Sequence, residues 1–177
     1  MFHKWAIQCQ SFVFLLLLGS CSPSFNWREY RFEGDPLTFL IPCKPNEQSK
    51  EVSIDKEKQV LVMAACNVEN INFTISRLKR AENMKTEDMI VLWQKASLHA
   101  LTGSDHIEAP SKDVKKLKIE NKEVMVYGLS NHKGIQADWR WFEQGQWVYQ
   151  LGIYLGKKQE KNKVDFETQN MFFESIR

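Results

Sequence analysis

The sequence predicts an α+β fold, in which an antiparallel β-sheet is flanked by helices. Strand-like segments follow one another closely before residue 80, and four more occur between residues 114 and 155. One segment with helical periodicity separates these two runs, and a second amphipathic segment closes the chain. Strands that are segregated from helices in this way favour an antiparallel sheet with helical cover over alternating parallel units.

Strands are expected where alternating or aromatic-rich apolar segments lie between turn residues. The first run comprises WREYRF, LTFLIP, EVSID, QVLVMAACNV and INFTISRLK. The second run comprises VKKLKIE, EVMVYGL, GIQADWRWF and QWVYQLGIYL, which short turns join into an antiparallel meander. The lysine-rich stretch 111–122 is expected to be a solvated edge strand, because lysine protects exposed sheet edges. Contact with anionic lipid or peptidoglycan is the alternative for this stretch.

The clearest helix is expected between Thr86 and Leu101. Its apolar residues recur at spacings of three and four, which predicts a buried face of Met89, Leu92, Trp93, Ala96, Ala100 and Leu101. Acidic residues in its first turn suit the positive end of the helix dipole, and Gly103 suits a left-handed stop. A second helix is expected over residues 164–177. Its inward-facing candidates are Val164, Met171, Phe172 and Ile176.

The first twenty residues have the composition of a signal peptide. Lys4 precedes the wholly apolar run Phe12–Leu18, and the stretch between them contains no acid. The run is much shorter than the roughly 20 apolar residues that a membrane-spanning helix needs. A buried N-terminal helix is the alternative, but it leaves the small polar residues after the run unexplained. We therefore expect residues 1–20 to be cleaved from the mature chain.

The end of this run, Leu18-Gly19-Ser20-Cys21, resembles the bacterial lipobox. The resemblance implies that the Cys21 thiol accepts diacylglycerol and that Cys21 becomes the first residue of a lipoprotein. Two or three acyl chains, such as palmitate, would give a stable membrane anchor. Ser22, in a position where Asp favours the inner membrane, implies periplasm-facing attachment to the outer membrane. Residues 21–26 would form a short lipidated tether, of which residues 22–26 span at most about 17 Å.

The mature chain is expected to be one domain, residues 27–177, with a disulfide between Cys43 and Cys66. These two cysteines remain once Cys9 leaves with the signal peptide and Cys21 is lipidated, and the periplasm is oxidising. The bond would close a loop of about 24 residues and contribute roughly 3 kcal/mol. The alternatives are a redox pair, which usually has its cysteines close together, and a metal site, which needs more ligands nearby.

An aromatic hairpin near the end of the chain is the main candidate for a binding site. With a loop at residues 144–146, Trp141 pairs with Tyr149 and Trp139 pairs with Leu151, so one face collects the large rings. Two interpretations stay open. The rings form a core face under a helix, or they form a stacking platform for a glycan, a peptide or a small molecule. The candidate ligand-binding residues are Trp139, Trp141, Trp147 and Tyr149.

Four features together resemble small proteobacterial lipoproteins of unknown function that have a PsbP-like fold. They are FLIPCKP, a second Cys in the next long strand, WFEQGQWVYQLGIY and the closing FFESIR. The resemblance spans Trp27 to Arg177 and implies an α/β/α sandwich. Members of the wider fold act as binding or assembly factors, and the resemblance carries over no catalytic residue.

Other classes of protein are not indicated by the sequence. The net charge of +2, without a cluster of basic residues, does not suggest nucleic-acid binding. Hydrolase, metalloprotease and phosphate-loop motifs are absent, so we expect no enzyme and no cofactor. His99 and His106 lack a recognised ligand spacing, so no metal is expected. The sequence thus predicts a lipid-anchored binding or assembly module with an envelope protein as partner, or alternatively a ligand-binding lipoprotein.

Overall fold

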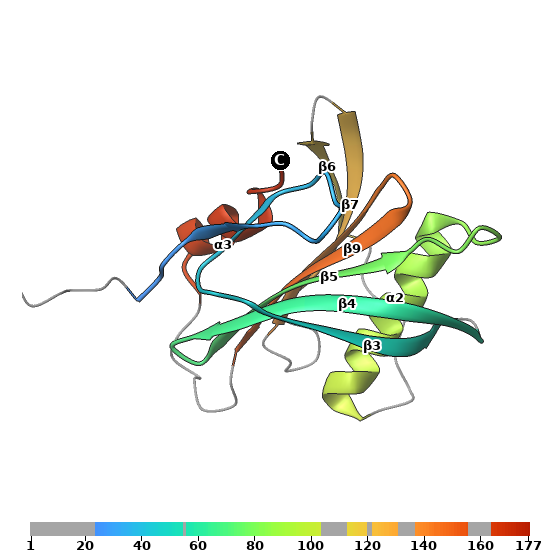
Figure 1. Cartoon of the computed structure of the whole chain (residues 1–177), viewed down its shortest axis with the longest axis horizontal. Coiled ribbons are helices and arrows are strands. Elements are labelled where there is room, and N and C mark those ends of the chain that lie inside the picture. Colours follow the sequence, from blue (N-terminus) through green and yellow to red (C-terminus); the bar gives the residue numbers. More distant parts are fainter. Residues whose placement is uncertain (1–23, 55, 104–112, 120–121, 131–136, 156–163) are drawn as a thin grey trace, which may run out of the picture.

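The computed structural model describes residues 24–54, 56–103, 113–119, 122–130, 137–155 and 164–177 (Figure 1). The predicted signal peptide, the predicted lipidation residue Cys21 and His106 lie outside these ranges. None of the helices in the described ranges is long and apolar enough to span a membrane.

Seven strands form one antiparallel sheet in the spatial order β3-β4-β5-β9-β8-β7-β6. Their bounds are β3 (Asn46–Ile54), β4 (Glu57–Val68), β5 (Ile71–Lys79), β6 (Asp113–Ile119), β7 (Lys122–Ser130), β8 (Ala137–Gln144) and β9 (Trp147–Leu155). The last four follow one another in the sheet, which confirms the predicted meander. Pairing of β9 with β5 joins this meander to the strands that precede the first helix.

The remaining elements are a two-stranded ribbon and two helices. The ribbon pairs β1 (Arg28–Tyr30) with β2 (Phe39–Ile41), and the helices are α2 (Thr86–Thr102) and α3 (Phe166–Phe173). The predicted α+β class, an antiparallel sheet with helices, is therefore confirmed. The lysine-rich strand β6 lies at one edge of the sheet, as expected, and its Lys116 pairs with Glu123 on β7 at 2.8 Å.

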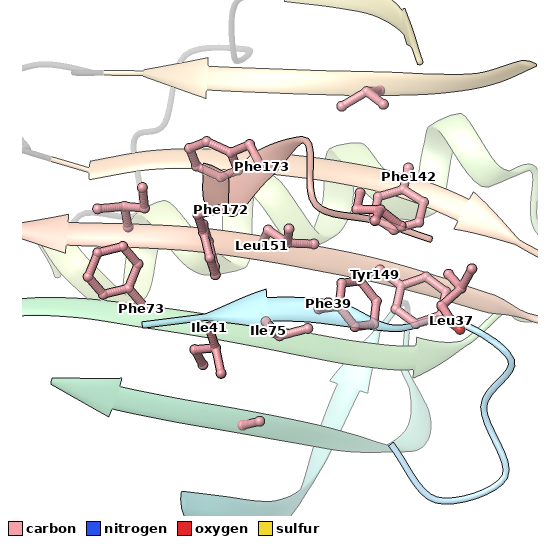
Figure 2. Packing of buried hydrophobic residues seen from close by; sticks show 14 of the residues in the cluster. Leu37, Phe39, Ile41, Phe73, Ile75, Phe142, Tyr149, Leu151, Phe172 and Phe173 are labelled. Atoms are coloured by element: carbon pink, nitrogen blue, oxygen red, sulfur yellow. The ribbon is translucent and has the colours of Figure 1, made fainter. Parts of the chain in front are cut away.

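Both faces of the sheet are covered, and each has its own apolar core. On one face, the ribbon and α3 cover rings and aliphatic side chains of the sheet; we call this the ribbon-side core (Figure 2). It contains Leu37, Phe39, Ile41, Phe73, Ile75, Phe142, Tyr149, Leu151, Phe172 and Phe173. Full burial of each large side chain is worth about 1.5–3 kcal/mol, so this layer contributes much of the stability of the domain.

The other face of the sheet lies under α2 and forms the helix-side core. It contains Ile54, Leu78, Met89, Ile90, Trp93, Leu98, Leu129, Ala137, Trp139, Trp141 and Val148. Neighbouring residues of β8 and β9 point alternately into the two cores, as the period of two in a strand requires. A sheet that is buried on both faces needs apolar residues at nearly every position, which explains the continuous apolar sequence of β9.

The buried face of α2 differs from the expected one. Met89 and Trp93 are buried as predicted, but Ala96, Ala100 and Leu101 are exposed. Ile90, Gln94 and Leu98 complete the buried face instead. Large side chains bury more apolar area than alanine does, so they decide which side of the helix meets the sheet. In α3, similarly, Phe173 is buried and Met171 is exposed.

The register of the β8–β9 hairpin also corrects the prediction. Trp141 pairs with Gln150 and Trp139 pairs with Gly152, because the turn contains two residues rather than three. Its first residue, Gly145, has a φ of 63°, and type II′ turns take glycine at this position. The prediction assumed one apolar and one polar face. With both faces buried, segregation of apolar residues to one face no longer selects the register.

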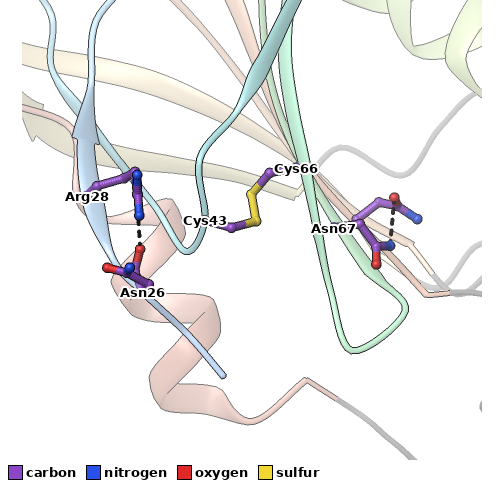
Figure 3. The surroundings of a disulfide bond; sticks show 6 residues. Asn26, Arg28, Cys43, Cys66 and Asn67 are labelled. Atoms are coloured by element: carbon purple, nitrogen blue, oxygen red, sulfur yellow. Dashed lines mark hydrogen bonds between the residues drawn. A yellow bond between two sulfur atoms is a disulfide. The ribbon is translucent and has the colours of Figure 1, made fainter. Parts of the chain in front are cut away.

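The predicted disulfide between Cys43 and Cys66 is present (Figure 3). Their Cα atoms are 5.9 Å apart, and the bond joins the segment between β2 and β3 to the last few residues of β4, near the β4–β5 turn. Next to it, the backbone N–H of Asn26 donates to the carbonyl of Pro42 at 2.7 Å. The disulfide and this hydrogen bond thus hold the beginning of the described chain against the sheet.

Candidate functional site

The long direction of the sheet has two ends, which differ in what surrounds them. At the proximal end lie the β4–β5 turn at Glu69–Asn70, the end of β9 and Phe25. At the distal end lie the β3–β4 connection, the end of β5 and the β8–β9 turn. Strand β5 connects the two ends, and its eight steps of about 3.3 Å place them about 26 Å apart.

Three of the four candidate ligand-binding residues lie inside the two cores. Trp139 and Trp141 are 0% exposed beneath α2, and Tyr149 is 0% exposed on the opposite face of the sheet. The sheet separates the tryptophans from the tyrosine, so the three rings form no common surface. Their geometry favours the interpretation as core residues over a stacking platform.

Trp147, the fourth candidate, is placed differently. It is only partly buried, at the distal end, and it contacts the edge of the ribbon-side core. The guanidinium carbon of Arg77 lies 4.4 Å from the centroid of the Trp147 ring and 4.7 Å from that of Phe32. Arg77 is therefore in cation–π contact with both rings, an arrangement that limits the orientations open to Trp147.

A buried carboxylate holds Arg77 in this position. Asp35 accepts hydrogen bonds from Arg77 Nη1 at 2.9 Å, from the hydroxyl of Tyr149 at 2.7 Å and from the backbone of Leu37 at 3.0 Å. Arg77 also donates to the carbonyl of Glu33 at 3.1 Å. These bonds compensate for the loss of solvation of a fully buried carboxylate. They hold the loop before β2 against the sheet, and they fix the Arg77 guanidinium in contact with the ring of Trp147.

The same contacts affect the hydroxyl of Tyr149. Burial, and then its hydrogen bond to the negatively charged Asp35, raise the pKa of Tyr149 above its ordinary value, while Arg77 lowers it in part. The phenol is consequently a stable hydrogen-bond donor near neutral pH. The cluster of Asp35, Arg77 and Tyr149 is therefore structural, because these residues form hydrogen bonds with one another; we call it the brace.

A hollow of about 490 Å³ opens beside Trp147 at the distal end. Its wall consists of Glu57, Lys58, Gln59, Val60, Val62, Lys79, Arg80, Ala81, Glu82 and Trp147. Pockets for small ligands commonly have volumes of 300–1,000 Å³. Val60 is 57% exposed, so the wall presents apolar surface next to an aromatic ring. The volume and the lining together fit a binding site.

One charged group of the hollow, the guanidinium of Arg80, is fixed by an ion pair. Arg80 is held by Glu143, with 2.8 Å between Nε and Oε1, and Glu143 also accepts a hydrogen bond from the hydroxyl of Thr86 at the start of α2. Gln59 Oε1 accepts no hydrogen bond within the described part of the chain, but this oxygen is buried and closed to a ligand. The Gln59 side chain shares its strand face with Leu61, which packs against the helix-side core. Val62 and Trp147 pack against the ribbon-side core instead.

The chemistry of the hollow suits binding. Its lining offers amines, carboxylates, one amide and one indole, but no hydroxyl, thiol or imidazole. In the described ranges, His, Cys, Asp and Glu side chains form no group of three that is able to hold a metal ion. Ring, apolar and charged surfaces in one hollow are features of ligand recognition.

The sequence reasoning did not identify Asp35, Arg77 or the hollow. Asp35 lies between a glycine and a proline, residue types that are typical of turns, and Arg77 lies in the expected strand INFTISRLK. One signal was available, because Arg77 shares its strand face with Phe73 and Ile75, both of which are buried. A cation that continues an inward-facing apolar pattern indicates a buried charge with a partner elsewhere in the chain.

Comparison with known proteins does not assign the chain to a family. No protein-family model matches it, and a search of curated proteins finds no match. Its function is therefore argued from its sequence motifs and from the geometry of the described residues.

Proposed function

We propose that this chain is a lipid-anchored, periplasm-facing module that binds or assembles with an envelope protein and has no catalysis of its own. The observation that carries the proposal is the short distance between the lipobox and the folded domain. Phe25 follows Cys21 by four positions, and its ring already lies 6.2 Å from that of Phe73 in the sheet. An extended chain covers only about 14 Å over four steps. Lipidation of Cys21 would therefore hold the proximal end close to the membrane.

The Cys43–Cys66 disulfide supports export to an oxidising compartment, because such bonds persist there and are rare in the cytosol. Ser22, where Asp would favour the inner membrane, supports the outer membrane as the site of attachment. In this orientation the hollow beside Trp147 faces away from the membrane, toward soluble or wall-bound partners.

A PsbP-like sandwich is part of the proposal. The seven-stranded antiparallel sheet, with α2 on one face and the ribbon and α3 on the other, supports it. In the wider fold that the sequence resembles, members act as binding or assembly factors. Since one fold serves many functions, the resemblance supports the class of function and not a particular partner.

Substitution of Cys21 tests the anchor. We expect Cys21→Ala to accumulate as an uncleaved precursor without lipid, detected as the intact mass of the membrane-extracted protein. Cys9→Ala is the matched control, since it removes a cysteine from the same signal peptide and leaves the lipobox unchanged. Normal maturation of Cys21→Ala would refute the lipoprotein assignment.

A second candidate function is recognition of a glycan or small molecule in the hollow beside Trp147. The exposed Val60, in the same hollow as the Trp147 ring, favours it. A photo-reactive amino acid in place of Val60 should form adducts in intact cells, and mass spectrometry would identify them as protein, peptidoglycan or a small molecule. Met125, an exposed apolar residue of β7, is the matched control position. Adducts at Met125 without adducts at Val60 would place the binding surface elsewhere.

A further inference from the structure

The proximal end carries aromatic side chains that the ribbon-side core buries only in part or not at all. Phe166, the first residue of α3, is 77% exposed. Phe25 and Trp27 are partly exposed, and their rings stack on each other with centroids 6.2 Å apart. In the described part of the chain, Phe166 is the most exposed of the large apolar residues. An aromatic ring in this position gains nothing from the folded domain alone.

These rings lie at the same end of the molecule. The ring of Phe73 contacts Phe25 at 6.2 Å, Trp27 at 6.3 Å and Phe172 of α3 at 5.3 Å. The first half of α3 lies at the proximal end, because Gln169 donates at 3.4 Å to Asp138 near the start of β8. Figures 1 and 3 both show the beginning of the described chain beside α3.

We infer that the proximal end is a membrane-contact surface, in which Phe166, Phe25 and Trp27 meet the headgroup region of the bilayer that holds the lipid anchor. The inference rests on the proposed lipidation of Cys21. The tether of four steps limits Phe25 to about 14 Å from the anchored residue, so no long stalk separates this end from the lipid surface. Trp favours the interface between water and hydrocarbon, and Phe is common on the apolar face of helices that lie at this interface. A membrane contact therefore accounts for the exposed ring of Phe166.

The charges around Phe166 define the kind of lipid surface that fits. Asp165 caps α3 by accepting from the backbone N–H of Thr168 at 2.8 Å, and Glu167 lies in the first turn. Both carboxylates are exposed beside the ring. They have to remain in water, so the contact is shallow, and they favour zwitterionic over anionic headgroups. The contact would fix the orientation of the domain and direct the Trp147 hollow away from the bilayer.

Reporter tryptophans at the two ends test the inference. Phe166→Trp places one at the proximal end, and Val60→Trp places one at a similarly exposed apolar position of the distal end. The lipidated full-length mature protein is reconstituted in phosphatidylcholine vesicles, with or without bromine in the acyl chains. The fluorescence that Phe166→Trp adds should fall by more than half in brominated vesicles, and the fluorescence that Val60→Trp adds should not change.

The outcomes distinguish a failure of the membrane contact from a failure of the lipid anchor at Cys21. The intact mass of each protein shows whether Cys21 carries acyl chains; their absence would overturn the anchor and, with it, the contact. With the acyl chains present, an unquenched Phe166→Trp would overturn only the contact. Equal quenching of both reporters would overturn it as well, because the domain would then have no fixed orientation. Trp27→Phe should reduce the quenching of the native fluorescence, and Trp147→Phe should leave the quenched part unchanged.

Discussion

The two ends of the sheet are built in different ways. The proximal end is filled, since a disulfide, stacked rings and the start of α3 close around Phe73. The distal end contains a hollow, and its partly buried Trp147 contacts Arg77, which forms a buried ion pair with Asp35. The loop that joins β1 to β2 reaches this end, where Phe32 and Asp35 contact Arg77. The comparison teaches that aromatic packing closes one end of the sheet, whereas a buried ion pair supports the other.

The largest effect is expected when the brace of the distal end is broken. Asp35→Ala leaves the Arg77 guanidinium buried without its partner, and removal of one member of a buried ion pair costs about 3–5 kcal/mol. Denaturant unfolding of the purified domain measures this loss. The exposed pair Lys58–Glu51 is the control, because Lys58→Ala should cost less than about 1 kcal/mol. Similar small losses in both variants would mean that the distal end does not depend on Asp35.

At the proximal end, removal of the disulfide should have the next largest effect. The double substitution Cys43→Ser and Cys66→Ser should lower the free energy of unfolding by about 3 kcal/mol, because the unfolded chain regains the entropy of an open loop. Hydrogen exchange should increase around β2 and the start of β3, and the walls of the hollow should keep their protection. Faster exchange around Trp147 in this variant would show that the two ends are not independent.

Close packing on the helix side of the sheet, between the two ends, predicts a smaller loss for Gly152→Ala. A Cβ at Gly152 would lie 2.8 Å from Thr74 Oγ1, 2.8 Å from Tyr154 Cε2 and 3.0 Å from Trp139 Cδ1. Overpacking of this kind costs about 1–3 kcal/mol. Val60→Leu, which enlarges an exposed side chain at the hollow, should leave thermal stability almost unchanged. A stable Gly152→Ala would contradict close packing between the sheet and the helix-side core.

The smallest effect concerns pH. Burial raises the pKa of Tyr149 above the ordinary value of 10.0, so the folded state retains a proton that the unfolded state loses above that pH. Its contribution is complete below about pH 10 and decreases as pH rises further. Tyr149→Phe should therefore reduce the loss of stability above pH 10 by up to about 1.4 kcal/mol per pH unit. Unfolding at several alkaline pH values measures this slope.

Tyr127→Phe serves as the control for this pH dependence. Tyr127 is less buried, although burial and Glu87 also raise its pKa. We expect a smaller change in slope for Tyr127→Phe than for Tyr149→Phe. Equal changes in the slope of unfolding free energy against pH would mean that the contact with Asp35 does not help Tyr149 to keep its hydroxyl proton.

The sequence by itself predicted the features that depend on local pattern or on counting. Strand and helix positions follow from periodicity, and the edge position of β6 follows from its lysines. The pairing of Cys43 with Cys66 was predicted by counting the cysteines that would remain in the mature domain, and it is present. The resemblance of residues 18–21 to a lipobox is also a local pattern, and it stays a prediction.

Only the tertiary structure decided the features that depend on what lies across the sheet. The hairpin register and the buried side of α2 could not be derived, because both faces of the sheet are covered and apolar residues occur on each. The Asp35–Arg77 pair joins residues 42 positions apart, and neither has a local signal for the other. The hollow is lined by parts of two segments, residues 57–62 and 79–82, together with Trp147. Such contacts are set by packing between distant segments, and a linear pattern records them only in part.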